Sequence, residues 1–331
     1  MTNCLRRCAL LLSLFFLAAS LVASAGDINP KAPGFTIERT PQRLARGKYL
    51  AEGLMHCFRC HSNNDFQHLN GQAAPEKKGA GNIIPAEEFT QPPPARMVCP
   101  NITPDEATGA GTWTDQDFAR AIRDGIGHDG RILNPLMPYW TLKVLTDEDL
   151  ASVIAYVRSI PAIRNELPKR SLLQEPVLMS APKFLTPAAP PGASEQVKRG
   201  EYLAHLGNCA GCHNAQTPER EPVAGMEYGG GRVLRGRWGV ITGQNITPDA
   251  SGIGYYDEQK FISVMRTGRV GARKLNPIMP WADFRNLSDG DLKALFAYLR
   301  TVPPVQHRVD NSEDPTYCPK CRNRHGFGDR N

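Results

Sequence analysis

The sequence predicts an all-α protein made of two tandem copies of one helical module, joined by a proline-rich linker. Three observations predict this fold. The same short motifs occur twice in the same order, hydrophobic residues recur at helical spacing behind capping residues, and prolines gather between the two copies. A chain of 331 residues with 41% hydrophobic residues is long enough for one large or two ordinary domains with packed cores.

The duplication is visible in four pairs of motifs. RGKYLAEG begins at 46 and RGEYLAHLG at 199, and NITPD begins at 101 and again at 245. LNPLMPYW at 133 pairs with LNPIMPW at 275, and LASVIAYVRSIP at 150 pairs with LKALFAYLRTVPP at 292. From Asn134 onward the offset between the copies is constant, which chance similarity would hardly produce.

These motifs divide the chain. The stretch between the copies contains six prolines, which exclude a helix interior, and it lacks the alternation of a strand. We therefore predict a signal peptide at 1–25, a first module at 35–161, a linker at 162–194, a second module at 195–308 and a polar tail at 309–331.

The helices of the first copy are predicted from their end signals. Thr114 begins a helix that Gly125 ends. Thr146 begins a second helix, in which Asp149 completes a capping box and after which Pro161 prevents continuation.

The second copy repeats this pattern, with Ser288 and Asp291 as its capping box. Short helices are also predicted over 43–54 and 196–206, where each leads into a pair of cysteines. The Gly- and Pro-rich stretches at 62–98 and 214–241 show no clear period and are predicted to be long loops.

The N-terminus is typical of an export signal. Arg6 and Arg7 precede an apolar run over 9–22, and Ala23-Ser24-Ala25 is an A-x-A cleavage site, so we predict cleavage after Ala25 and a periplasmic protein. An uncleaved anchor is the alternative. The net charge of +6 is weak support for any partner, and no nucleic-acid-binding motif accompanies it, so no nucleic-acid partner is expected.

Two cysteine motifs carry the chemistry, CFRCH at 57–61 and CAGCH at 209–213. Cysteines at i and i+3 and a histidine at i+4 lie on one face of a helical turn, which is the arrangement of a c-type haem attachment site. A single such motif could also be a thioredoxin-like cysteine pair or half a zinc site. Two such motifs at matching places behind an export signal favour haem attachment. We predict two covalently bound haem c groups, attached at Cys57, Cys60, Cys209 and Cys212, with His61 and His213 as iron ligands.

The sixth iron ligands are predicted from the repeat. Met137 and Met279 alone among the methionines occupy equivalent positions, and the prolines beside them favour a fixed loop. The other methionines are expected in the core or in loops. His56, His68, His128 and His205 have no counterpart in the other copy, so loop or surface positions are expected for them.

Three further features stay open at the sequence level. Cys99 lies where the second copy has Gly243, and it could be a thiolate ligand, a free thiol or a disulfide partner. Arg237 could neutralise a haem propionate or be solvated. In the tail, Cys318, Cys321 and His325 could supply three metal ligands with no visible fourth, or the cysteines could form a disulfide, including one with Cys99, or an exposed pair.

Together these motifs, over about 43–160 and 196–303, resemble class I cytochrome c modules. In particular they are similar to the cytochrome subunits of periplasmic quinohaemoprotein alcohol dehydrogenases and gluconate dehydrogenases. The resemblance implies thioether-bound haem at each cysteine pair and His/Met axial ligation. Subunits of that family usually carry three modules and this chain carries two, so a free-standing dihaem cytochrome fits as well.

The predicted function is single-electron transfer in the periplasm, without catalytic residues. The expected partners are redox proteins: a periplasmic dehydrogenase as donor, another cytochrome or a terminal oxidase as acceptor, and peripheral membrane association through such a complex. One alternative is a dihaem redox enzyme, resembling thiosulfate dehydrogenases or dihaem peroxidases, with a labile or Cys99-ligated haem. Another is a subunit whose haems serve a catalytic partner only within a complex.

Overall fold

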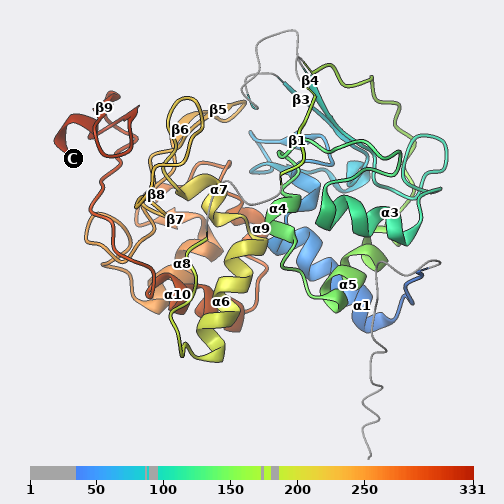
Figure 1. The fold of residues 1–331 in the computed structure, drawn as a ribbon, viewed down its shortest axis with the longest axis horizontal. Helices are drawn as coiled ribbons and strands as arrows, with labels where there is room; N and C mark the ends of the chain where they lie inside the picture. The colour runs from blue at the N-terminus through green and yellow to red at the C-terminus, as the bar shows by residue number, and fades with distance from the viewer. Residues whose placement is uncertain (1–34, 86–87, 89–95, 173–174, 180–185) are drawn as a thin grey trace, which may run out of the picture.

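The computed structural model describes residues 35–85, 88, 96–172, 175–179 and 186–331. The predicted signal peptide therefore lies outside the described residues. Figure 1 shows the two halves of the chain side by side, each with its own group of helices, and the C-terminal tail at the far end of the second half. No helix in the described ranges combines the length and the apolar character that crossing a membrane requires.

The all-α prediction is wrong, because the described residues are 32% helix and 12% strand. The described residues contain five two-stranded antiparallel sheets. Their strands are β1 Asn64–Asp65 with β2 Gln72–Ala73, β3 Asn82–Pro85 with β4 Arg96–Cys99, β5 Val233–Gly236 with β6 Gly239–Thr242, β7 Arg269–Val270 with β8 Arg273–Lys274, and β9 Thr316–Cys318 with β10 Asn323–His325. Three of these hairpins occupy the segments predicted as long loops, since strands this short show too little alternation to be recognised.

Capping residues begin three helices of the first half, two of them at the predicted positions Thr114 and Thr146. Thr40 accepts a hydrogen bond from the Arg43 backbone at the start of α1, and Thr114 forms a complete capping box with Asp117 at the start of α3. The helices are α1 Pro41–Lys48 with a π-helical continuation Tyr49–Leu54, α3 Asp115–Ala119 with a π-helical turn Arg120–Asp124, α4 Tyr139–Leu142 and α5 Asp147–Val157.

The second half repeats this set. Ser194, Asp257 and Ser288 cap three of its helices. The helices are α6 Glu195–Leu206, α7 Cys209–His213, α8 Glu258–Thr267, α9 Trp281–Phe284 and α10 Asp289–Leu299.

A glycine in each half allows two helices to approach closely. Helix α1 packs against α5, and α6 packs against α10. A Cβ atom added to Gly47 would lie 1.9 Å from the Ser152 carbonyl oxygen, and one added to Gly200 would lie 2.0 Å from that of Ala294. Both contacts are too short for any side chain, so each helix pair requires its glycine.

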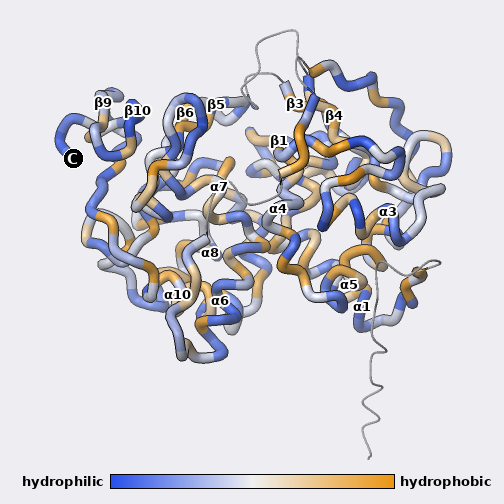
Figure 2. The backbone as a smooth tube through the Cα atoms, in the orientation of Figure 1, coloured by the Kyte–Doolittle hydropathy of each residue, from blue (hydrophilic) through white to orange (hydrophobic). Residues whose placement is uncertain are grey.

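One continuous hydrophobic core contains buried residues of both halves, including Leu50, Leu150 and Ile154 from the first and Leu203 and Leu292 from the second. Figure 2 shows hydrophobic stretches inside the molecule and a largely hydrophilic C-terminal end. Because the core is shared, the structure does not show two separate tandem modules. The domain boundaries stay a prediction.

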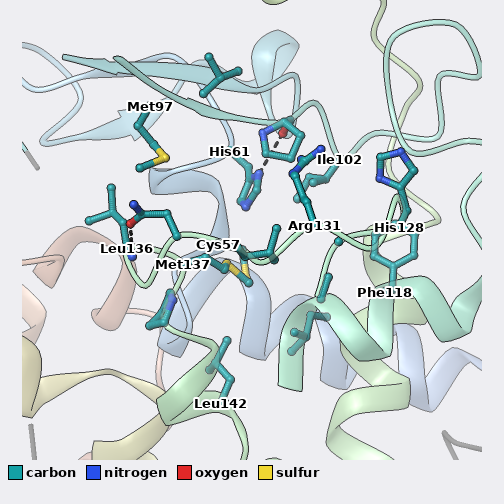
Figure 3. Close-up of a pocket in the computed structure, with 18 of the residues that line it drawn as sticks. Cys57, His61, Met97, Ile102, Phe118, His128, Arg131, Leu136, Met137 and Leu142 are labelled. Carbon is teal, nitrogen blue, oxygen red and sulfur yellow. Dashed lines mark hydrogen bonds between the residues drawn. The ribbon is translucent and has the colours of Figure 1, made fainter. Parts of the chain in front are cut away.

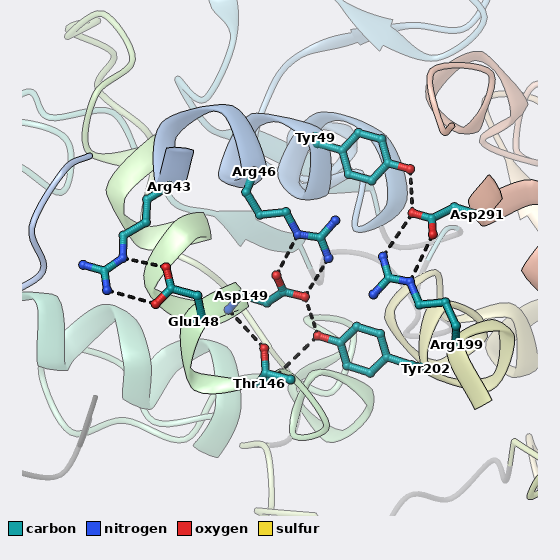
Figure 4. A network of polar contacts seen from close by, with 9 residues as sticks. All are labelled: Arg43, Arg46, Tyr49, Thr146, Glu148, Asp149, Arg199, Tyr202 and Asp291. Carbon is teal, nitrogen blue, oxygen red and sulfur yellow. Dashed lines mark hydrogen bonds and ion pairs between the residues drawn. The ribbon is translucent and has the colours of Figure 1, made fainter. Parts of the chain in front are cut away.

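Two matching polar clusters join the halves (Figure 4). Arg46 forms an ion pair with Asp149 at 2.7 Å, and Tyr202 of the other half donates to the same carboxylate at 2.7 Å. In the same way, Arg199 pairs with Asp291 at 3.0 Å while Tyr49 donates to it at 2.7 Å.

The capping boxes predicted at Thr146 and Ser288 are only half formed, because Asp149 and Asp291 take part in these clusters. Thr146 and Ser288 do cap α5 and α10, but the backbone N–H of each cap residue donates to a tyrosine of the other half, namely Tyr202 and Tyr49. The two aspartates are thereby free to bind arginine. Tertiary contacts thus replace the local capping hydrogen bond that the sequence pattern predicted.

The segment predicted as a linker packs along both halves. The Asn101 side chain donates to the Ile163 carbonyl at 2.7 Å, and the Asn165 side chain donates to that of Ala80 at 2.7 Å. Tyr298 of α10 donates to the Pro187 carbonyl at 2.5 Å. These described parts of the segment are therefore held by side-chain hydrogen bonds to the body of the protein.

Candidate haem sites

Each cysteine motif forms a single helical turn. In the first, the backbone N–H groups of Cys60 and His61 both donate to the Cys57 carbonyl, at 3.2 and 3.1 Å. In the second, the same positions form α7. A turn of this kind brings positions i, i+3 and i+4 to one face, so both cysteines and the histidine of each motif can meet one planar group.

An unusual backbone conformation precedes both motifs. His56 has φ 38° and Asn208 has φ 50°, and both lie in the left-handed region. Residues other than glycine rarely adopt this conformation, although asparagine tolerates it better than most. It turns the chain sharply from the preceding helix into the cysteine motif. Of the two residues, only the asparagine is a sequence signal for this conformation.

The two motif histidines are oriented in the same way. His61 Nδ1 lies 2.9 Å from the Pro100 carbonyl oxygen, and His213 Nδ1 lies 2.7 Å from that of Gln244. A carbonyl only accepts, so Nδ1 carries the hydrogen and Nε2 keeps a lone pair for a metal. Burial lowers the pKa of both imidazoles, which favours the neutral, metal-binding form.

A cavity lies beside the first motif (Figure 3). It encloses about 1250 Å³ of space free of protein atoms, part of it open to solvent. Its walls are mainly apolar, and the lining includes Cys57, His61, Ile102, Trp113, Leu133 and Met137. The cavity therefore fits a large apolar group that is held at a cysteine and bound by an imidazole.

The predicted methionine ligands sit in loops of identical geometry. The Asn134 side chain accepts from the Leu136 N–H at 2.9 Å, and its carbonyl accepts from Met137 at 2.9 Å. In the second half, Asn276 accepts in the same way from Ile278 at 3.0 Å and from Met279 at 3.1 Å. Each methionine is half-buried and packs against the core. Their roles as ligands stay a prediction.

Two other possible iron ligands line the first cavity. Met97 lies on β4, and His128 stacks on Trp113 with 4.4 Å between the ring centroids. Neither has a counterpart in the second half, which is why Met97 was expected in the core or a loop and His128 in a loop or on the surface. His68 is exposed and contacts Asp65 at 2.9 Å, so it lies on the surface as expected.

Cys99 lies beside a cysteine of the first motif. A hydrogen bond with Cys99 lowers the pKa of the Cys60 thiol, and the same bond, together with burial, raises the pKa of Cys99. Val98 and Pro100 on either side of Cys99 line the cavity, whereas Cys99 and Cys60 themselves are not among its lining residues. The lining therefore does not distinguish a thiolate ligand from a free thiol at Cys99. Among the described residues, Cys99, Cys318 and Cys321 form no disulfide, and neither do the four motif cysteines.

The arginine predicted to neutralise a propionate has another partner. Arg237 forms an ion pair with Glu88 at 2.6 Å and lies over the Phe66 ring. A different arginine, Arg232, lies beside Cys212 and donates to the Gly211 carbonyl. Burial lowers the pKa of Arg232, although the Cys212 sulfur opposes this shift. The sequence pattern gave no signal for this arginine.

Comparison with known proteins agrees with this geometry. The sequence model of the cytochrome c family matches residues 44–161. The chain is 28% identical over 307 residues to the cytochrome c subunit of the quinone alcohol dehydrogenase of Gluconobacter oxydans, covering 86% of this chain and 60% of that protein. It is 30% identical over 276 residues to the fructose dehydrogenase cytochrome subunit of Gluconobacter japonicus, covering 78% and 52%.

A third relative has a similar length. The chain is 25% identical over 263 residues to a diheme cytochrome c-type protein of Cereibacter sphaeroides, covering 76% of this chain and 83% of that protein. By contrast, the chain spans less than two thirds of the length of both dehydrogenase subunits. Residues 44–161 therefore form a cytochrome c domain, which binds haem c covalently, in a chain homologous to the cytochrome c subunits of alcohol and fructose dehydrogenases.

Proposed function

We propose that this protein is a dihaem cytochrome c that transfers single electrons between partner proteins. The observation that carries the proposal is the matched geometry of the halves: in each, a motif histidine is anchored through Nδ1 and a methionine follows an asparagine turn. The haem attachment residues are Cys57 and Cys60 in the first half and Cys209 and Cys212 in the second. The axial ligands are His61 with Met137, and His213 with Met279.

The side chains have distinct tasks in this proposal. When bound, the haem supplies an iron centre that exchanges one electron. Each cysteine thiol would add its S–H across a vinyl group of the haem, which forms a thioether without needing an oxidant. The histidine and the methionine of each half would both ligate the iron, which would leave no position for a substrate. The mainly apolar walls of the first cavity suit the apolar face of a haem.

We further propose that the protein works in the periplasm with a dehydrogenase as electron donor and with another cytochrome or a terminal oxidase as acceptor. The names of the dehydrogenase relatives and the export signal support this. Membrane association would be peripheral, through the partner complex. Fractionation of the native host, with N-terminal sequencing of the mature protein, tests location and cleavage after Ala25. Co-purification with a dehydrogenase tests the partner.

Haem attachment is tested by intact mass. Produced in a host that matures c-type cytochromes, the wild-type protein should carry two haems. Replacing Cys57 and Cys60 with serine should remove one haem, and replacing Cys209 and Cys212 should remove the other. Cys99→Gly, which removes a cysteine outside both motifs, is the matched control and should keep both. A wild-type protein without added haem mass would overturn the proposal.

The axial methionines are tested by ligand access. In the reduced Met279→Ala protein, the haem should stay attached, and its iron should bind carbon monoxide, which the wild type excludes. Met137→Ala should do the same at the first site, whereas Met97→Ala and His128→Ala are the matched controls and should not. If Met97→Ala or His128→Ala opens the first iron instead, the assignment of Met137 is wrong. Likewise, His213→Ala should disturb the spectrum of the second haem and leave the first unchanged.

A further inference from the structure

Three side chains of the C-terminal tail and one residue just before it form a cluster of four metal-binding side chains, separate from the haem sites. They are His307, Cys318 at the end of β9, Cys321 in the following turn and His325 at the end of β10. All four are buried, with 1% exposure or less, and their ligand atoms lie within 4.8 Å of one another. The sequence supplied three of these residues, and the fold adds His307 as the fourth.

The two histidines point the same nitrogen into this cluster. His307 Nδ1 lies 2.7 Å from the Gly229 carbonyl oxygen, and His325 Nδ1 lies 2.7 Å from that of Gly326. Because a carbonyl only accepts, each Nδ1 is the protonated nitrogen. Both Nε2 atoms then present lone pairs, yet they lie only 3.1 Å apart. Two facing lone pairs repel each other unless a cation lies between them.

The spacing of the ligand atoms matches tetrahedral coordination. With metal–nitrogen bonds of about 2.0 Å and metal–sulfur bonds of about 2.3 Å, the edges of a zinc tetrahedron are about 3.3 Å between two nitrogens and about 3.5 Å between nitrogen and sulfur. The observed distances are 3.1 Å between the two Nε2 atoms and 3.5 Å from His307 Nε2 to Cys318 Sγ. The cluster needs little movement to bind such an ion.

We propose that His307, Cys318, Cys321 and His325 form a structural Zn²⁺ site. Two cysteines and two histidines in a closed tetrahedral set are a typical ligand set of structural zinc. Two thiolates, two neutral imidazoles and Zn²⁺ sum to zero charge, which suits a buried position. Binding releases the two thiol protons to solvent.

The surrounding backbone leaves room for this cluster. Gly231 has φ 108°, and a Cβ atom there would lie 2.8 Å from Cys321 Cβ and 3.2 Å from His307 Cε1. Arg322, which directly follows Cys321, has φ 57° and donates its backbone N–H to the Cys318 carbonyl at 2.9 Å. A left-handed conformation at arginine is unfavourable and persists only where the surroundings fix it.

The zinc site holds the tail against the second half. The His307 backbone N–H donates to Ser251 Oγ at 2.8 Å, and the Asn323 side chain donates to the Gln216 carbonyl at 3.0 Å. Cys318 and Cys321 pack with Ala215 and Met226, in the segment that follows the second haem motif. The tail thereby covers the loop behind the second haem site, and zinc fixes it there.

The test measures metal in the mature holoprotein, purified without a metal-affinity tag. Mass spectrometry should find about one zinc per chain, and zinc-edge X-ray absorption should show two sulfurs at about 2.3 Å and two nitrogens at about 2.0 Å. His325→Gln and the Cys318→Ser/Cys321→Ser variant should lose at least about four fifths of this zinc. His68→Gln, which removes an exposed histidine, is the matched control and should keep it.

Several outcomes would overturn the zinc site. One is wild-type protein without zinc, in which peptide mapping finds a Cys318–Cys321 disulfide. Another is zinc that oxygen and nitrogen atoms alone surround, and a third is zinc content that His325→Gln leaves unchanged. Since the absorption measurement uses wild-type protein, it decides the question even if the variants fail to fold.

Discussion

The two candidate haem sites share the positions of their histidines and methionines but differ around the cysteines. Between the cysteines, the first motif has Arg59 where the second has Gly211. Opposite the motif, the first half has Cys99 where the second has Gly243. The elements that would bind a haem are therefore the same in both halves, whereas the residues that support the motif differ.

The Arg59 side chain connects the first motif to the second half of the chain. Its guanidinium forms an ion pair with Asp283 of the second half at 2.5 Å, and both side chains are 8% exposed. It also donates to the Pro277 carbonyl at 2.8 Å, in the loop that carries Met279. Gly211 has no side chain to reach the first half in return. The first motif thus supports the methionine loop of the second site, and the reverse contact does not exist at this position.

The largest predicted effect comes from removing Arg59. Arg59→Leu leaves the Asp283 carboxylate buried without its cation, which should reduce the free energy of unfolding by about 3–5 kcal/mol. It should also loosen the Met279 loop and increase carbon monoxide binding at the second iron only. Denaturant unfolding and ligand-binding spectra measure the two effects.

The matched control for this prediction is Arg164→Gln, which breaks an exposed ion pair with Glu166. Exposed pairs contribute little to stability, so this variant should unfold like the wild type. If Arg59→Leu is no less stable than the control, or if the first iron opens instead of the second, the proposed support of the Met279 loop is wrong.

The next effect should be equal in the two halves. Gly47→Ala and Gly200→Ala each force a methyl group against a backbone carbonyl, at 1.9 and 2.0 Å before any relaxation. Each should reduce the free energy of unfolding by about 3 kcal/mol, the upper end for overpacking. Thermal or denaturant unfolding measures it. Gly290→Ala in α10 is the control: its nearest neighbour is 3.8 Å away, so it should stabilise the protein by up to about 1 kcal/mol.

A smaller effect should appear as a pH dependence. Burial alone would raise the pKa of Asp149 and Asp291, but hydrogen bonds from arginine and tyrosine outweigh it and lower both. A carboxyl group with a lowered folded pKa contributes stability that is fully present above its ordinary pKa of about 4 and is lost as pH falls through the folded value. Asp149→Asn and Asp291→Asn should each cost about 2 kcal/mol at neutral pH and less in acid.

Acid unfolding curves from pH 7 down to about pH 2 test this prediction. The two asparagine variants should converge on the wild type at the acid end and should resemble each other throughout. Asp129→Asn, on an exposed loop pair with Arg131, is the comparison for a less buried carboxylate. Unequal behaviour of Asp149→Asn and Asp291→Asn would show that the two clusters are not equivalent.

The sequence predicted the local features of both sites and missed the long-range ones. The cysteine motifs, the Asn-Pro methionine loops and the caps at Thr146 and Ser288 depend on residues close in the chain, so their spacing was informative. The contact of Arg59 with Asp283, the exchange of Tyr49 and Tyr202 between capping sites, and the approach of His307 to the tail cysteines join distant residues. The spacing of residues along the chain does not reveal contacts between distant residues. Arg59 and the tail cysteines, moreover, occur in one half only, so comparing the two copies could not point to them.

The smallest predicted effect concerns Cys99, and it decides what kind of site the first half contains. Cys99→Gly gives the first half the residue of the second and removes only the thiol beside Cys60. Both haems should attach, both low-spin spectra should stay as in the wild type, and the free energy of unfolding should change by less than about 1 kcal/mol. Absorption and electron paramagnetic resonance spectra of the oxidised protein measure this. A changed axial signature at the first iron would instead identify Cys99 as a ligand, so the two halves would then differ in chemistry and not only in the residues around their cysteines.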